Sequence, residues 1–159
     1  MKKPLLILGA VIVGAWAIAR WTGAEKSADV SDPSLILNRL WVDRLPVKPK
    51  DTANVFATIT RQKLGVFQSV SQYKGSYELF HFTASGGELR VVYPQTDQQE
   101  TVKARAWKCK EEDMDFCLEL TGASRGVKRY HSLDGWEIRD ASTPEQLLER
   151  AAALVRASN

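Results

Sequence analysis

The chain has 159 residues, of which 44% are hydrophobic and 26% charged, and its formal net charge is +3. All 19 acidic residues lie at or after Glu25. Three basic residues precede that position, Lys2, Lys3 and Arg20, so the rest of the chain is electrically neutral. Because a nucleic-acid binder needs a surplus of Lys and Arg to neutralise phosphates, this balance argues against a nucleic-acid partner.

The chain begins with an export signal. Lys2 and Lys3 are followed by sixteen uncharged, mostly apolar residues, 4–19. A positive start followed by an apolar run is the pattern that the secretion machinery recognises. We therefore expect the rest of the protein to fold outside the cytoplasm.

This export signal, residues 1–21, can either be cleaved or be retained as a membrane anchor. Sixteen helical residues span roughly 24 Å against a hydrocarbon core of about 30 Å, which suits cleavage near Ala19 or Ala24 and a periplasmic or secreted product. Arg20 can instead extend its charge to the interface, so that 4–24 forms a single-pass anchor. We expect retention in a bacterial inner membrane, with the C-terminal domain outside the cytoplasm.

A polar linker, 22–34, separates the signal from one β-rich globular domain, 35–159. A short helix is predicted at the start of this domain, because Asp32 suits the N-cap and Pro33 the first helical position. The helix should end before Pro46, which cannot continue it.

Strand patterns then follow one another at short intervals. Glycine turns separate them, and Asp134-Gly135 is the strongest hairpin signal among these turns. Eight strands are predicted, over residues 54–61, 65–72, 76–84, 88–93, 101–109, 116–121, 128–133 and 136–139. With tight turns and no helix between them, these strands predict an antiparallel meander.

The chain ends in a predicted amphipathic helix. Thr143 can serve as its N-cap, Pro144 occupies the first helical position, and Gln146 completes a capping-box pattern. One apolar stripe runs from Leu147 to Val155, which indicates that the helix packs on the sheet.

These elements predict a mainly β domain whose sheet closes, or nearly closes, into a barrel. The first helix would plug one end, and the last would cover the outside, since closure removes exposed strand edges. In element order alone this resembles the lipocalins and calycins. The glycine-x-tryptophan motif of the first lipocalin strand is absent, because residues 38–41 supply Trp41 without the glycine. The alternative is an open, strongly curved sheet wrapped on a helix.

Two cysteines, Cys109 and Cys117, flank a predicted hairpin turn. If they lie opposite each other, Trp107 lies opposite Glu119, and both cysteines share one face. An exported protein favours a structural disulfide, with two reduced thiols or a redox pair as alternatives. The spacing matches no zinc or thioredoxin-type motif.

Residues that could perform catalysis are few. The two histidines, His81 and His131, lie in different predicted strands, and no spacing joins either to a nucleophile or a ligand set. We therefore predict no enzyme, metal or cofactor.

A possible binding face lies on the predicted hairpin that carries the cysteines. Trp107 shares the polar face with Arg105 and Glu119, and aromatic residues among charges are typical of binding patches. The alternative is a tryptophan stacked on neighbouring arginines. A second aromatic, Tyr73, shares one face with Phe67, Ser69 and Ser71.

The predicted function is that of a non-enzymatic, exported or membrane-anchored envelope module that acts as a protein-binding adaptor or assembly factor. The alternative is a small carrier that holds an apolar ligand or lipid inside its barrel.

Overall fold

The computed structural model describes residues 31–141 and 143–157. The predicted export signal, 1–21, and the predicted membrane span, 4–24, lie outside the described residues, so export and anchoring stay predictions. Within the described part of the chain, no helix is long and apolar enough to cross a membrane.

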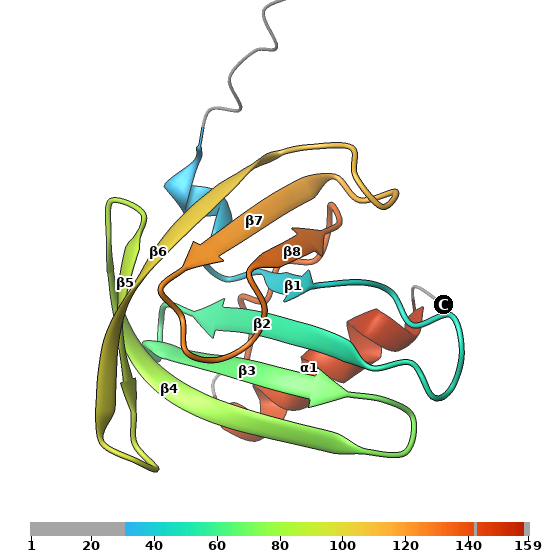
Figure 1. Cartoon of the computed structure of the whole chain (residues 1–159), viewed down its shortest axis with the longest axis horizontal. Coiled ribbons are helices and arrows are strands. Elements are labelled where there is room, and N and C mark those ends of the chain that lie inside the picture. The colour runs from blue at the N-terminus through green and yellow to red at the C-terminus, as the bar shows by residue number, and fades with distance from the viewer. Residues whose placement is uncertain (1–30, 142, 158–159) are drawn as a thin grey trace, which may run out of the picture.

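Eight antiparallel strands follow one another around a closed barrel (Figure 1). Every strand pairs with its neighbours in the sequence, and β8 returns to β1 where His131 lies opposite Val42. The strands are β1 (Leu40–Val42), β2 (Ala53–Ile59), β3 (Leu64–Val70), β4 (Gly75–Ser85), β5 (Glu88–Tyr93), β6 (Gln98–Lys108), β7 (Phe116–Thr121) and β8 (Arg129–Ser132). The predicted closed meander is confirmed, and the sheet is not open.

One predicted strand, 136–139, is wrong. The Asp134-Gly135 turn forms as expected, with Gly135 at φ 81°. Beyond it, however, a single bridge joins Glu137 to Arg39, and the chain leaves the barrel. The reason is burial, because Trp136 and Ile138 pack on the outer side of the barrel instead of continuing the sheet.

The first helix is shorter than predicted. It is a 3₁₀ helix, η1 (Pro33–Leu35), capped by the Asp32 carboxylate, which accepts from the Ser34 N–H at 2.9 Å. The prediction that it continues toward Pro46 is wrong, since Asn38 adopts φ 54° and the chain then forms β1. A three-residue strand therefore supplies the eighth member of the barrel.

The short helix closes one end of the barrel, as predicted. The Asp32 N–H donates to the Ala106 carbonyl of β6 at 2.7 Å. Ile36 is buried in the barrel core, and its carbonyl accepts from the Trp41 indole N–H at 3.3 Å. Trp41 is thus a core residue on β1.

Aromatic rings fill the barrel interior. Phe80 lies at their centre, with ring centroids 5.1 Å from Phe67, 6.1 Å from Phe56, 6.1 Å from Tyr93 and 6.2 Å from Phe82. All five rings are buried and belong to one cluster with Tyr130 of β8 and the smaller apolar residues of β5 to β7. Such dense packing makes the barrel a solid core.

A second apolar cluster lies on the outside of β1, β2 and β3, under helix α1 (Pro144–Ala157) (Figure 1). The Gln146 N–H donates to Thr143 Oγ1 at 3.3 Å, which confirms the predicted cap. Leu147 and Ala151 are buried in this cluster, and Leu148 packs against it. The side chains of 154–157, at the end of the predicted apolar stripe, lie outside the described part.

Candidate binding surfaces

The predicted disulfide between Cys109 and Cys117 is present, with the two Cα atoms 5.7 Å apart. The predicted register is wrong by two residues. Cys117 lies opposite Trp107, and Glu119 lies opposite Arg105. Cys109 follows the end of β6, where its N–H donates to the Asp115 carbonyl at 2.9 Å, so the bond joins diagonal neighbours. Parity is preserved because the shift is even.

The predicted binding face places Trp107 between two arginines. The guanidinium carbons of Arg105 and Arg129 lie 4.4 Å and 4.9 Å from its ring centroid, and the indole is only 3% exposed. Glu119 accepts from Arg105 at 3.4 Å and pairs with Lys128 at 3.2 Å. Hydrogen bonding to Lys128 lowers the pKa of the Glu119 carboxyl. This face therefore presents charged groups that are already paired with one another, and its tryptophan ring is covered.

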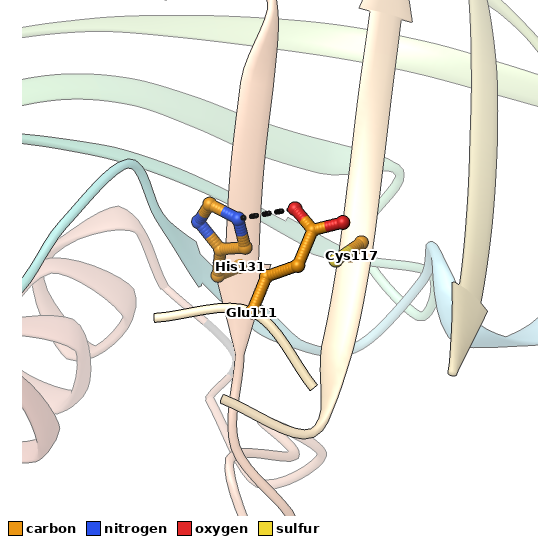
Figure 2. A group of neighbouring side chains, drawn as sticks. All are labelled: Glu111, Cys117 and His131. Atoms are coloured by element: carbon orange, nitrogen blue, oxygen red, sulfur yellow. Dashed lines mark ion pairs between the residues drawn. The ribbon is translucent and has the colours of Figure 1, made fainter. Parts of the chain in front are cut away.

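A buried histidine lies beside the disulfide. His131 Nε2 is 3.6 Å from a Glu111 carboxylate oxygen, and its Nδ1 is 3.4 Å from the Asp43 carbonyl oxygen. Figure 2 shows the Glu111 carboxylate reaching over from the β6–β7 loop toward this ring and toward Cys117. Arg129 donates to both carboxylate oxygens, at 2.5 and 2.7 Å, and this hydrogen bonding lowers the pKa of Glu111.

This cluster has the residue types of a metal site but not the free ligand atoms. The sulfur of Cys117 is bonded to Cys109, so it is not a thiolate. The Glu111 carboxylate and the His131 imidazole remain as ligands, and the Arg129 guanidinium already donates to both oxygens of this carboxylate. A zinc site needs at least three protein ligands, so the cluster is better explained as support for the β7–β8 packing. The other histidine, His81, is exposed on β4.

The first half of β4 forms part of a different candidate surface. Its backbone pairing with β3 is fixed at both ends: the Phe82 N–H donates to the Lys63 carbonyl at 3.0 Å, and the Ser71 N–H donates to the Lys74 carbonyl at 2.8 Å. Hydrogen-bonded pairs alternate along an antiparallel ladder. The even-numbered residues of β4 therefore direct their backbone groups toward β3.

The odd-numbered residues Gly75, Tyr77 and Leu79 direct their N–H and C=O groups away from β3. Pairing with β5 begins only at His81, opposite Val92. We call the outward backbone groups of these three odd-numbered residues the β4 edge. It runs along the lower margin of the molecule in Figure 1, where β4 continues beyond the end of β5.

The edge is open because β5 ends early. The next residue that would face Leu79 is Pro94, which has no N–H to donate. The chain turns there, and the Thr96 N–H donates to the Tyr93 carbonyl at 3.2 Å. β4 has eleven residues and β5 six, so among the described residues the length mismatch leaves the β4 edge without a neighbouring strand.

A groove of about 610 Å³ adjoins the β4 edge at the tip of the β3–β4 hairpin. Hydroxyl groups and two lysines line most of it. We call it the tip groove; its lining residues are Lys50, Thr52, Ser69, Ser71, Tyr73, Lys74, Gly75 and Ser76.

A second groove, of about 240 Å³, continues from the tip groove into the barrel mouth, and the two share Ser69 and Ser76. The loop between β7 and β8 covers this mouth. Its Arg125 donates to Glu78 of β4 at 2.5 Å and to Gln98 of β6 at 2.9 Å, so the loop is tied to two strands.

Tyr93 supports the same loop from inside the barrel. Its hydroxyl donates to Glu100 at 2.6 Å, and Glu100 accepts from the Ser124 N–H. Burial is the main cause that raises the pKa of the Tyr93 hydroxyl, and the hydrogen bond to Glu100 raises this pKa further. The loop that covers the barrel mouth is therefore held in place by hydrogen bonds to the barrel.

Exposed aromatics collect at the tip of the β3–β4 hairpin. Tyr73 is 69% exposed and Tyr77 57%, and Val47 of the adjoining β1–β2 loop is 88% exposed. The sequence pattern that grouped Tyr73 with Ser69 and Ser71 pointed to this groove. The β4 edge was missed, although the unequal lengths of two neighbouring strand patterns were a signal for it.

Comparisons with protein-family models, with curated proteins and with solved structures found no match. The surfaces themselves are therefore the basis for inferring a function.

Proposed function

We propose that the protein is a non-enzymatic module of the bacterial cell envelope that binds an extended segment of another protein along the β4 edge. In this proposal residues 4–24 hold it in the inner membrane, and the barrel acts outside the cytoplasm. The single observation that carries the proposal is the row of outward backbone groups at Gly75, Tyr77 and Leu79.

A partner strand would satisfy the β4 edge directly. Backbone N–H and C=O groups at an open edge can accept a further strand, whose main-chain hydrogen bonds supply affinity while neighbouring grooves select its side chains. Tyr77 lies on the edge itself, and the tip groove with Tyr73 lies at its beginning. Tyrosine is enriched at protein interfaces because its ring is apolar and its hydroxyl polar.

The carrier alternative finds less support. A ligand inside the barrel would need the space that the rings of Phe56, Phe67, Phe80 and Tyr93 occupy. The barrel has a packed core, whereas ligand-binding barrels enclose a cavity.

Site-specific photocrosslinking in the native host tests the proposal. A photoreactive phenylalanine analogue at Tyr77 of the full-length protein is expected to trap one partner, and the same analogue at exposed Lys103, on β6, serves as control. The partner, once identified by mass spectrometry, is purified for affinity measurements.

Two substitutions at Tyr77 then separate the side chain from the backbone. Tyr77→Ala removes the ring and keeps the outward N–H, whereas Tyr77→Pro removes both and leaves the hydrogen bonds to β3 in place. We expect the proline variant to bind the partner more weakly than the alanine variant, with circular dichroism of both unchanged. Equal affinities of the two variants would exclude strand addition.

A further inference from the structure

We infer that the segment bound along the β4 edge is acidic, and that its carboxylates lie at the tip-groove end of the edge. This inference rests on the proposed function and specifies the chemistry of the partner. The charges around the hairpin tip, the opposite charge at the other end of the edge, and the backbone geometry support it.

The two segments that meet at the tip carry a net positive charge. Residues 47–51 and 71–77 together contain three basic residues, Lys48, Lys50 and Lys74, and one acidic residue, Asp51. That carboxylate is already used, because its Oδ2 accepts the backbone N–H groups of Val47 and Lys48 at 3.1 and 2.9 Å. The Asp51 carboxylate thus stabilises its own loop, and the lysines of the loop stay available to a partner.

Three exposed lysines surround the tip: Lys48 and Lys50 from the β1–β2 loop and Lys74 from the β3–β4 turn. The two segments touch, since the Gln72 N–H donates to the Pro49 carbonyl at 3.2 Å. None of the three lysines forms an ion pair with a described residue. An acidic segment would supply the missing charge and would be steered toward this end.

The opposite end of the β4 edge has a different charge. Because His81 pairs with Val92, Leu79 is the edge residue nearest the β5–β6 turn, and this turn carries exposed Asp97. Carboxylates of a bound segment are repelled there and attracted at the lysines. The edge therefore favours acidic residues at the tip-groove end of a bound segment.

Lysines and tyrosines also suit an anionic membrane surface. The geometry favours a peptide, because lipid headgroups would use the lysines but offer no regular row of donors and acceptors to Gly75, Tyr77 and Leu79. Strand addition uses both features at once.

The test is a selection of random eight-residue peptides displayed on phage, with the full-length protein immobilised in phosphatidylcholine nanodiscs. Three proteins are compared: the natural chain, Lys50→Gln with Lys74→Gln, and Arg61→Gln with Lys63→Gln. The last pair removes the same charge from the exposed turn at the other end of β3. Selected peptides are then measured against versions in which Gln and Asn replace Glu and Asp.

We expect selected peptides to be rich in Asp and Glu at one end, and to shift the amide resonances of Gly75, Tyr77 and Leu79. Their affinity should fall about tenfold when Lys50 and Lys74 are replaced, as two ion pairs of about 0.7 kcal/mol each would give. It should be unchanged in the control variant. The amide versions of the peptides should lose affinity similarly.

The failures are distinguishable. Peptides that shift the edge resonances but carry no acidic bias would overturn the inference and leave the proposed function standing. The absence of any peptide that shifts these resonances would overturn both. Binding of phosphatidylglycerol vesicles that depends on Lys50 and Lys74, without peptide binding, would assign the surface to the membrane and overturn the inference.

Discussion

Arg125 donates from Nε to the Glu78 carboxylate at 2.5 Å, and this one bond joins the β7–β8 loop to β4 across the barrel mouth. Both side chains are partly shielded from solvent, and the Arg125 guanidinium also lies 4.9 Å from the Tyr93 ring centroid. Hydrogen bonding to Glu78 raises the pKa of Arg125. The loop is thus held to β4 by a charge pair rather than by strand pairing.

Replacement of Arg125 by glutamine should loosen this loop. Glu78 would keep a partly shielded carboxylate without its charged partner, which lowers the free energy of unfolding by more than the loss of a solvated pair does. Urea unfolding measures the loss, and hydrogen exchange should quicken at the Ser124 amide. Arg44→Gln is the matched control: Arg44 pairs with Asp43 at 3.4 Å in solvent and should change stability by less than about 0.5 kcal/mol. Equal losses in the two variants would contradict this account.

Gly65 makes room for the central ring of the barrel. A Cβ at Gly65 would lie 2.1 Å from Cζ of Phe80, which is buried. Gly65→Ala should therefore lower the free energy of unfolding by about 1 to 3 kcal/mol, because the packed rings leave no space for displacement. Gly75→Ala provides the control, since its Cβ would meet Val70 Cγ2 at an ordinary 3.8 Å. If thermal denaturation shows equal melting temperatures for the two variants, the interior is looser than its ring contacts indicate.

How far the sequence predicted this fold depended on the length of each element. The patterns at 88–93 and 116–121 gave the bounds of β5 and β7 correctly, because a turn closes each end. The strand β1 was missed because three residues are too few for alternation to appear, and the preceding Asp32-Pro33 cap favoured a helix. Pairing with distant residues fixes this strand, at three positions with β2 and at Val42 with His131 of β8.

The candidate sites were also predicted only in part, because alternation along a strand does not show which side chains cover one another. Alternation placed Trp107 on the polar face of β6 correctly, yet the ring is buried, because Arg105 of the same strand and Arg129 of β8 cover it. Burial by charged side chains is invisible to a hydrophobic pattern. The β4 edge likewise depends on where β5 stops, which Pro94 signals only once the pairing of the two strands is known.

The disulfide should stabilise the β6–β7 hairpin. Cys109 and Cys117 close a short loop, and the chain-entropy model gives such a bridge about 2.5 kcal/mol of stability. A double replacement by alanine should lower the free energy of unfolding by this amount in urea. A reducing agent should lower the stability of the natural protein to a similar level and leave the double variant unchanged. A reductant effect on the variant would show that the loss does not come from the bridge.

The ion pair between Glu111 and Arg129 of β8 should make the free energy of unfolding depend on pH. Because Arg129 lowers the folded-state pKa of Glu111, the ion pair adds stability above the unfolded-state pKa of about 4.3 and loses it as the pH falls through the lower folded-state value. Glu111→Gln should thus be less stable than the natural protein at about pH 6, by less than about 1 kcal/mol since the side chain is half exposed, and this difference should narrow as the pH falls to about 2. Urea unfolding followed by tryptophan fluorescence measures both. Glu112→Gln, at the neighbouring exposed position, should match the natural protein at both pH values. A difference in stability that stays constant over this pH range would mean that the Glu111 side chain stabilises the protein through its shape rather than its charge.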